Sequence, residues 1–142
     1  MQTGVKVGDC MKTSLVTIRD DAPAYEAASL MRDNNVGSVL VTNASNKIYG
    51  IVSERDLVVK VLAANKCGAV VKEVASKPVL TIAADADLSE AARMMGEKNV
   101  KRLAVARNGE VIGIISQKDI IRISPSLYDL IAETAKARLK MF

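Results

Sequence analysis

Two seven-residue segments, Gly50–Asp56 and Gly113–Asp119, contain the polar residues that are the best candidates for a functional site. Each segment reads glycine, two aliphatic residues, serine, two variable residues and aspartate. A serine that opens a helix leaves free backbone N–H groups in the first turn, and these attract anions such as phosphate. An aspartate three residues later suits the vicinal hydroxyls of a ribose, as acidic residues do in dinucleotide sites. The combination predicts nucleotide binding.

A purely structural role is open for the same residues. Ser-x-x-Asp at a helix start is close to a capping box, in which the acid accepts a bond from the backbone N–H of the serine. However, Arg55 and Lys118 place a cation in the first turn of both helices, where it opposes the helix dipole by roughly a few tenths of a kcal/mol. Because both copies keep a cation at this unfavourable position, we expect an anion to bind nearby.

The two copies differ just before the second strand of each. The first copy has Val36-Gly37-Ser38, whereas the second has Val100-Lys101-Arg102. The two cations could add charge to a phosphate pocket, or could be a solvated pair at the start of a strand. Taken alone, the pair leaves both interpretations open.

These segments occupy equivalent places in an internal duplication of the chain. An offset of 64 residues aligns Thr17 with Thr81 and Met31 with Met95. After a turn that is one residue shorter in the second copy, the offset is 63 and Gly50 aligns with Gly113. An indel confined to a turn, with the register kept on both sides, is what duplication of a folded unit predicts.

Each copy predicts the element order β-α-β-β-α. The expected strands are 15–18, 39–41 and 48–52 in the first copy, and 103–106 and 111–115 in the second, the latter two joined by an Asn108-Gly109 hairpin turn. The first helices, capped by Asp21 and Asp85, carry apolar stripes at Ala24, Ala27, Ala28 and Met31 and at Leu88, Ala91, Ala92 and Met95. The second helices start at Ser53, with Leu57, Val58, Val61 and Leu62 as the stripe, and at Ser116.

The composition is that of a soluble globular chain that does not rely on the commonest catalytic designs. Its 142 residues are 49% hydrophobic and 25% charged, with a net charge of +4. Without histidine, a Ser-His-Asp or Cys-His nucleophile and a His-containing zinc site are excluded. The two cysteines, the lack of a long apolar run and the lack of a signal peptide predict a cytoplasmic protein with free, buried thiols. The scattered cations give little support to nucleic-acid binding.

The order, spacing and closing G-h-h-S-x-x-D motif, found twice, resemble a tandem pair of cystathionine-β-synthase (CBS) domains, or Bateman module, over residues 5–123. The resemblance implies an α/β (α+β) fold in which two β-α-β-β-α repeats pack through their sheets about a pseudo-twofold axis. We therefore expect repeat 1 at 5–62, a linker at 63–70, repeat 2 at 71–123 and an amphipathic helix at 124–142. That last helix could cover the core, form a dimer seam or dock another protein.

The resemblance also implies two clefts for an adenosine ligand (AMP, ADP, ATP or S-adenosylmethionine) and a homodimer. In each cleft the motif residues of one copy meet the first strand and the pre-hairpin residues of the other. One cleft would use Ser53, Arg55, Asp56, Thr81, Ala86, Val100, Lys101 and Arg102. The other would use Thr17, Ala22, Val36, Gly37, Ser38, Ser116, Lys118 and Asp119.

The expected function is that of a non-catalytic adenosine-nucleotide sensor that regulates an unidentified protein in trans. Because three of the expected cations fall in the Asp56 cleft and one in the Asp119 cleft, we expect the Asp56 cleft to bind a phosphorylated adenosine more tightly. The alternatives are an S-adenosylmethionine sensor and an assembly subunit whose clefts stay empty. No catalytic residue, catalytic cofactor or metal site is expected, nor any association with a membrane.

Overall fold

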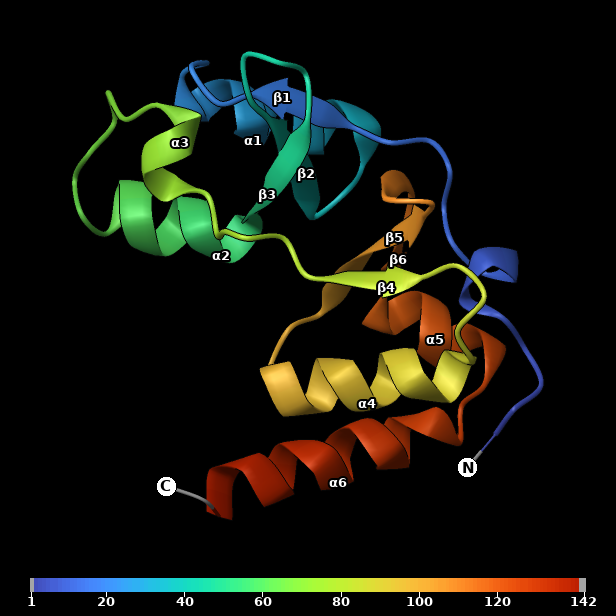
Figure 1. The fold of residues 1–142 in the computed structure, drawn as a ribbon. Coiled ribbons are helices and arrows are strands. Elements are labelled where there is room, and N and C mark those ends of the chain that lie inside the picture. The colour runs from blue at the N-terminus through green and yellow to red at the C-terminus, as the bar shows by residue number, and fades with distance from the viewer. Residues whose placement is uncertain (1, 141–142) are drawn as a thin grey trace. The chain divides into compact units, whose positions relative to one another are not determined.

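The computed structural model describes residues 2–140 and divides them into two compact units. The middle unit is Leu15–Val79. The terminal unit combines the chain up to Ser14 with the chain from Leu80 onward. Both units mix helices with a three-stranded sheet, which confirms the expected mixed α+β class (Figure 1).

The middle unit has a sheet with the strand order β1-β2-β3. Strand β1 is parallel to β2, and β2 is antiparallel to β3. The helix α1 links β1 to β2, and the short α2 after β3 continues as the π-helical segment η2. The elements are β1 (Thr17–Arg19), α1 (Ala24–Asn34), β2 (Ser38–Thr42), β3 (Ile48–Ser53), α2 (Glu54–Asp56), η2 (Leu57–Leu62) and α3 (Val71–Val74).

The terminal unit repeats this topology with the strand order β4-β5-β6. The register is also repeated, since Thr17 pairs with Leu40 and Thr81 with Ala104. The elements are η1 (Val7–Asp9), β4 (Thr81–Ala83), α4 (Leu88–Lys98), β5 (Arg102–Arg107), β6 (Glu110–Ser116), α5 (Gln117–Ile123) and α6 (Leu127–Lys140). The predicted β-α-β-β-α order is therefore confirmed in both copies.

Local sequence explains most of the element boundaries. Asn108 and Gly109 have φ angles of 53° and 79° in the β5–β6 hairpin, the left-handed values that this turn requires. Asn35 and Asn99 end α1 and α4 in the same left-handed conformation.

The predicted caps of α1 and α4 are wrong. Asp21 and Asp85 lie in turns that close before each helix begins, and the N-cap residues are Pro23 and Asp87. Only Asp87 caps with its side chain, which accepts a hydrogen bond from the backbone N–H of Ser89.

The first short helix of each sequence repeat packs in the unit formed by the other repeat. Val7 of η1 is fully buried in the core of the terminal unit, where its N–H donates to the carbonyl of Ala86. At the offset of 64 its equivalent is Val71 of α3, which is fully buried in the core of the middle unit and donates to Ala22. Each compact unit is thus the body of one repeat with the first segment of the other.

The tail helix α6 completes the core of the terminal unit. Leu127 and Ile131 are buried in the same cluster as Ala92, and α6 runs alongside α4 (Figure 1). The approach is close because Gly96 has no side chain: a Cβ there would overlap the hydroxyl of Thr134. The last residues placed in this helix by the prediction, Met141 and Phe142, lie outside the described residues.

Within residues 2–140, no helix covers the equivalent face of α1 as α6 covers α4. Ala28, predicted to lie on the apolar stripe, is exposed, whereas its equivalent Ala92 is fully buried. Arg32 stands where α4 has Gly96, and Tyr25 stands where α4 has Ser89. An arginine in place of Gly96 does not permit the close helix contact that the glycine allows.

The predicted stripe of the η2 segment is only half buried. Leu57 and Val61 pack against the core of the middle unit. Val58 and Leu62, in contrast, are 56% and 71% exposed. Among residues 2–140, no helix combines the length and the apolar character needed to span a membrane.

Candidate functional site

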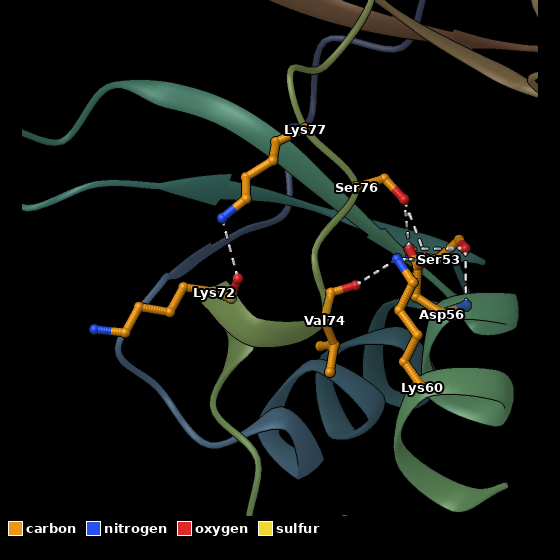
Figure 2. Close-up of polar contacts among 7 residues, drawn as sticks. All are labelled: Ser53, Asp56, Lys60, Lys72, Val74, Ser76 and Lys77. Atoms are coloured by element: carbon orange, nitrogen blue, oxygen red, sulfur yellow. Dashed lines mark hydrogen bonds and ion pairs between the residues drawn. The ribbon is translucent and has the colours of Figure 1, made fainter. Parts of the chain in front are cut away.

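Both motif aspartates form the capping box that their spacing allows. Asp56 Oδ2 accepts hydrogen bonds from the backbone N–H of Ser53 at 2.9 Å and from its hydroxyl at 3.1 Å (Figure 2). Asp119 Oδ2 accepts the same two bonds from Ser116 at 3.0 and 2.9 Å. In return each serine Oγ accepts the backbone N–H of its aspartate. The structural interpretation of the motif is therefore confirmed in both copies.

The second carboxylate oxygen of Asp56 faces two groups that the sequence did not point to. Lys60 Nζ lies 2.9 Å from Asp56 Oδ1, and the Ser76 hydroxyl donates to the same oxygen at 3.1 Å (Figure 2). Lys60 also donates to the carbonyl of Val74 at 3.1 Å. Asp56 is only 7% exposed. A buried carboxylate needs a partner for its charge, and Lys60 supplies one.

The second oxygen of Asp119 has a different set of partners. Arg122 Nη2 donates to Asp119 Oδ1 at 2.7 Å, and Lys12 Nζ lies 3.9 Å from it. Asp119 is 2% exposed, whereas the Arg122 and Lys12 side chains are 69% and 60% exposed. Two cations thus neutralise a buried carboxylate from the solvent side.

The thiol of Cys10 lies in the same N-terminal segment as Lys12. Burial, followed by the negative charges of Asp9 and Asp119, raises the pKa of the Cys10 thiol above its usual range. The thiol is therefore protonated at neutral pH. Both Cys10 and Cys67 are free, as the sequence predicted, but the predicted burial is wrong: Cys10 is only half-buried and Cys67 is exposed.

The predicted pre-hairpin residues lie next to the motif of their own unit. In the middle unit Ser38 pairs with Ser53, and the N–H of Glu54 donates to the carbonyl of Gly37 at 3.1 Å. In the terminal unit Arg102 pairs with Ser116, and the N–H of Gln117 donates to Lys101 at 2.8 Å.

Each unit thus brings together residues that the prediction assigned to different clefts. The assignment of residues from both units to a shared cleft stays a prediction.

The remaining predicted site residues are placed as follows. Thr17 and Thr81 are exposed on β1 and β4, where only the middle residue of each strand is buried. Arg55 and Lys118 are exposed next to the motif aspartates. Ala22, Ala86, Val36 and Val100 are half-buried.

The sequence missed Lys12, Lys60, Ser76 and Arg122. Lys60 and Arg122 lie one helical turn after the motif aspartates, so helical spacing was an available signal. Lys12 and Ser76 lie in segments that precede the first strand of each repeat. The duplication aligns Lys12 with Ser76, but only the structure shows that their side chains lie close to Asp119 and Asp56.

The duplicated sheet-and-helix unit, with a capping-box aspartate after the third strand of each copy, defines a tandem-repeat module. The family model described as "CBS domain" matches residues 7–63 and 71–126. The chain belongs to the CBS-domain family.

A relative in Methanopyrus kandleri, the uncharacterized protein MK0525, is 34% identical over 135 residues, which cover 93% of this chain and 69% of the relative. Among solved structures, the CBS domain protein PAE2072 of Pyrobaculum aerophilum, complexed with AMP, is similar with a TM-score of 0.79 and 24% identity, over 90% of this chain and 99% of that one. CBSX2, also in complex with AMP, has a TM-score of 0.73 and 25% identity, over 88% of this chain and 99% of that one.

Proposed function

We propose that this chain is a non-catalytic regulatory module that binds an adenosine nucleotide, AMP first among the candidates, at the Asp56 and Asp119 motifs. The observation that carries the proposal is the pair of buried motif carboxylates, each of which caps a helix through one oxygen and presents the other to polar side chains. The similarity to CBSX2, which was crystallised with AMP, supports the choice of ligand.

The two oxygens of each motif carboxylate have different roles. Oδ2 is committed to the cap, so it keeps the carboxylate in one orientation. Oδ1 faces cationic side chains that are partly in solvent, such as Lys60 at 43% and Lys12 at 60% exposure. A ribose diol would donate two hydrogen bonds to the carboxylate, so it could replace part of what these side chains supply to Oδ1.

Binding of the nucleotide would regulate a partner protein in trans. This requires that the ligand favours one conformation of the module over another. A homodimer is part of the proposal: Val58, Val59 and Leu62 form an exposed apolar patch on η2 that a second copy would cover.

The first test measures adenosine, AMP, ATP and S-adenosylmethionine binding to the full chain by calorimetry, with native mass spectrometry for the oligomeric state. We expect Asp56→Asn to abolish the tighter AMP site and Asp119→Asn to leave it. Glu54→Gln, an exposed neighbour in the same helical turn, is the matched control and should bind as wild type does. Loss of AMP binding in Asp119→Asn with full retention in Asp56→Asn contradicts the order of the two sites.

An assembly subunit with unoccupied motifs is the second candidate. It is favoured by the fact that protein groups already satisfy both carboxylates. Thermal melting separates the two functions, because a ligand at 100 times its dissociation constant adds about 2.7 kcal/mol of stability. Absence of any shift with the four compounds would support the assembly role and reject the sensor.

A further inference from the structure

Lys12 and Ser76 occupy equivalent positions that the backbone fixes against the third strand of each unit. Lys12 and Ile114 exchange two backbone hydrogen bonds of 2.9 Å each. Ser76 and Ile51 exchange the same pair at 3.0 and 2.8 Å. The offsets of the duplication relate Lys12 to Ser76 and Ile51 to Ile114, so one structural position carries a cation in one unit and a hydroxyl in the other.

At this position the side chain faces the motif carboxylate. The Ser76 hydroxyl lies 3.1 and 3.3 Å from the two oxygens of Asp56, as Figure 2 shows. Lys12 Nζ lies 3.9 Å from Asp119 Oδ1, beyond hydrogen-bond distance. Both residues therefore belong to the surroundings of the ribose acceptor that the proposed function assigns to these aspartates.

The two side chains differ in what they offer a ligand. The Ser76 hydroxyl is neutral and can both donate and accept, whereas the Lys12 ammonium only donates and adds a full charge. Lys12 is also free to leave Asp119, because Arg122 holds the same carboxylate oxygen at 2.7 Å and keeps the charge compensated. With 60% of its side chain in solvent, Lys12 can follow a phosphate group on its flexible stem.

We propose that the residue at this position sets the charge preference of each site: Lys12 makes the Asp119 site favour adenosine ligands with more phosphate groups, and Ser76 leaves the Asp56 site to the monophosphate. The inference rests on the proposed function, because it requires an adenosine ligand at the motif aspartates.

The test exchanges the two residues in the full chain and compares AMP with ATP by calorimetry. In an Asp56→Asn background, which isolates the Asp119 site, Lys12→Ser should lower the preference for ATP over AMP by roughly three- to tenfold, as expected for loss of one partly screened charge. Lys12→Arg should retain the preference. Lys47→Ser removes an equal charge from an exposed hairpin turn and should leave the preference unchanged.

The reciprocal variant tests the other site. In an Asp119→Asn background, Ser76→Lys should raise the preference for ATP over AMP by a similar factor. If the wild-type chain binds but neither exchange alters the preference by more than about twofold, the inference is overturned and the proposed function stands. If the wild-type chain binds none of adenosine, AMP, ADP and ATP, both the proposed function and this inference are rejected.

Discussion

At the scale of single residues, the motif aspartates show that a structural and a ligand-binding role can share one side chain. The spacing of Ser53 and Asp56 indicated the cap as one of two interpretations, because both partners lie within one helical turn. The contacts of Asp119 with Lys12 could not be predicted, since the two residues come from opposite ends of the chain. The spacing of residues in the sequence indicates contacts within one helical turn. Contacts between residues that are far apart in the sequence, such as Lys12 and Asp119, could not be predicted from it.

Asp87 is the residue for which a pH dependence is expected. Its carboxylate accepts hydrogen bonds from Thr3, Gly4 and Ser89, which ties the N-terminal segment to the start of α4. The bond from the Ser89 hydroxyl, helped by the backbone N–H groups of Ser89, Thr3 and Gly4, holds the pKa of Asp87 well below its usual range. Its contribution to stability is therefore fully present above the unfolded-state pKa of about 3.9 and is lost as the pH falls toward the folded-state value.

We predict that Asp87→Asn lowers the urea midpoint at pH 7 and that the difference from wild type narrows below about pH 4. Asp85→Asn, an exposed neighbour, should change neither value. Urea titrations at pH 7 and pH 3 provide the measurement. An Asp87→Asn deficit of the same size at both pH values would contradict the assigned role of the carboxylate.

At the scale of elements, the pairing of α6 with α4 depends on small residues more than on amphipathicity. The apolar pattern predicted a helix after Pro125 but left its partner open, because several surfaces could have covered it. Gly96 decides the question in the structure, since any side chain there would meet Thr134 and the carbonyl of Ile131. Such a contact depends on shape, which the hydrophobic pattern does not encode.

Gly96→Ala should destabilise the chain by about 1–3 kcal/mol through overpacking, although alanine is the better helix former. The Cβ would lie 2.7 Å from the backbone oxygen of Ile131, so α6 itself must shift. Gly68→Ala is the matched control, because its Cβ meets no atom within 4 Å. Chemical unfolding and limited proteolysis of the C-terminal helix would report the change. Equal stability of the two variants would show that the helix contact tolerates a methyl group.

At the scale of the whole molecule, the duplication predicted two similar sheets but not how the chain is divided between them. The self-alignment places Val7 in the first repeat and Val71 in the second. The contacts place them the other way round, with Val7 in the terminal unit and Val71 in the middle unit. A sequence alignment compares residues of the same type and carries no information on which copy of a surface a segment contacts.

The packing of each first segment in the unit of the other repeat predicts which unit a core mutation destabilises. Val7→Ala should loosen the terminal unit, with faster amide hydrogen exchange in β4–β6 and α4, while Val71→Ala should loosen the middle unit. A cost of about 1–3 kcal/mol is expected for each, since both side chains are fully buried. Hydrogen-exchange mass spectrometry of the two variants locates the effect. Faster exchange in β1–β3 on mutation of Val7 would contradict the assignment.

Because each repeat packs its first segment in the unit of the other repeat, the order of synthesis affects when the two units can be completed. The middle unit is one continuous stretch, Leu15–Val79, so all of its contacts become possible as soon as Val79 has emerged. Residues 2–14 are synthesised before the middle unit, yet their partners in β4, α4 and β6 are synthesised after it. Since domains generally fold as units during synthesis, we expect residues 2–14 to pack only after the second repeat has been synthesised. A segment that is synthesised before the middle unit thus reaches its own packing partners only after that unit is complete.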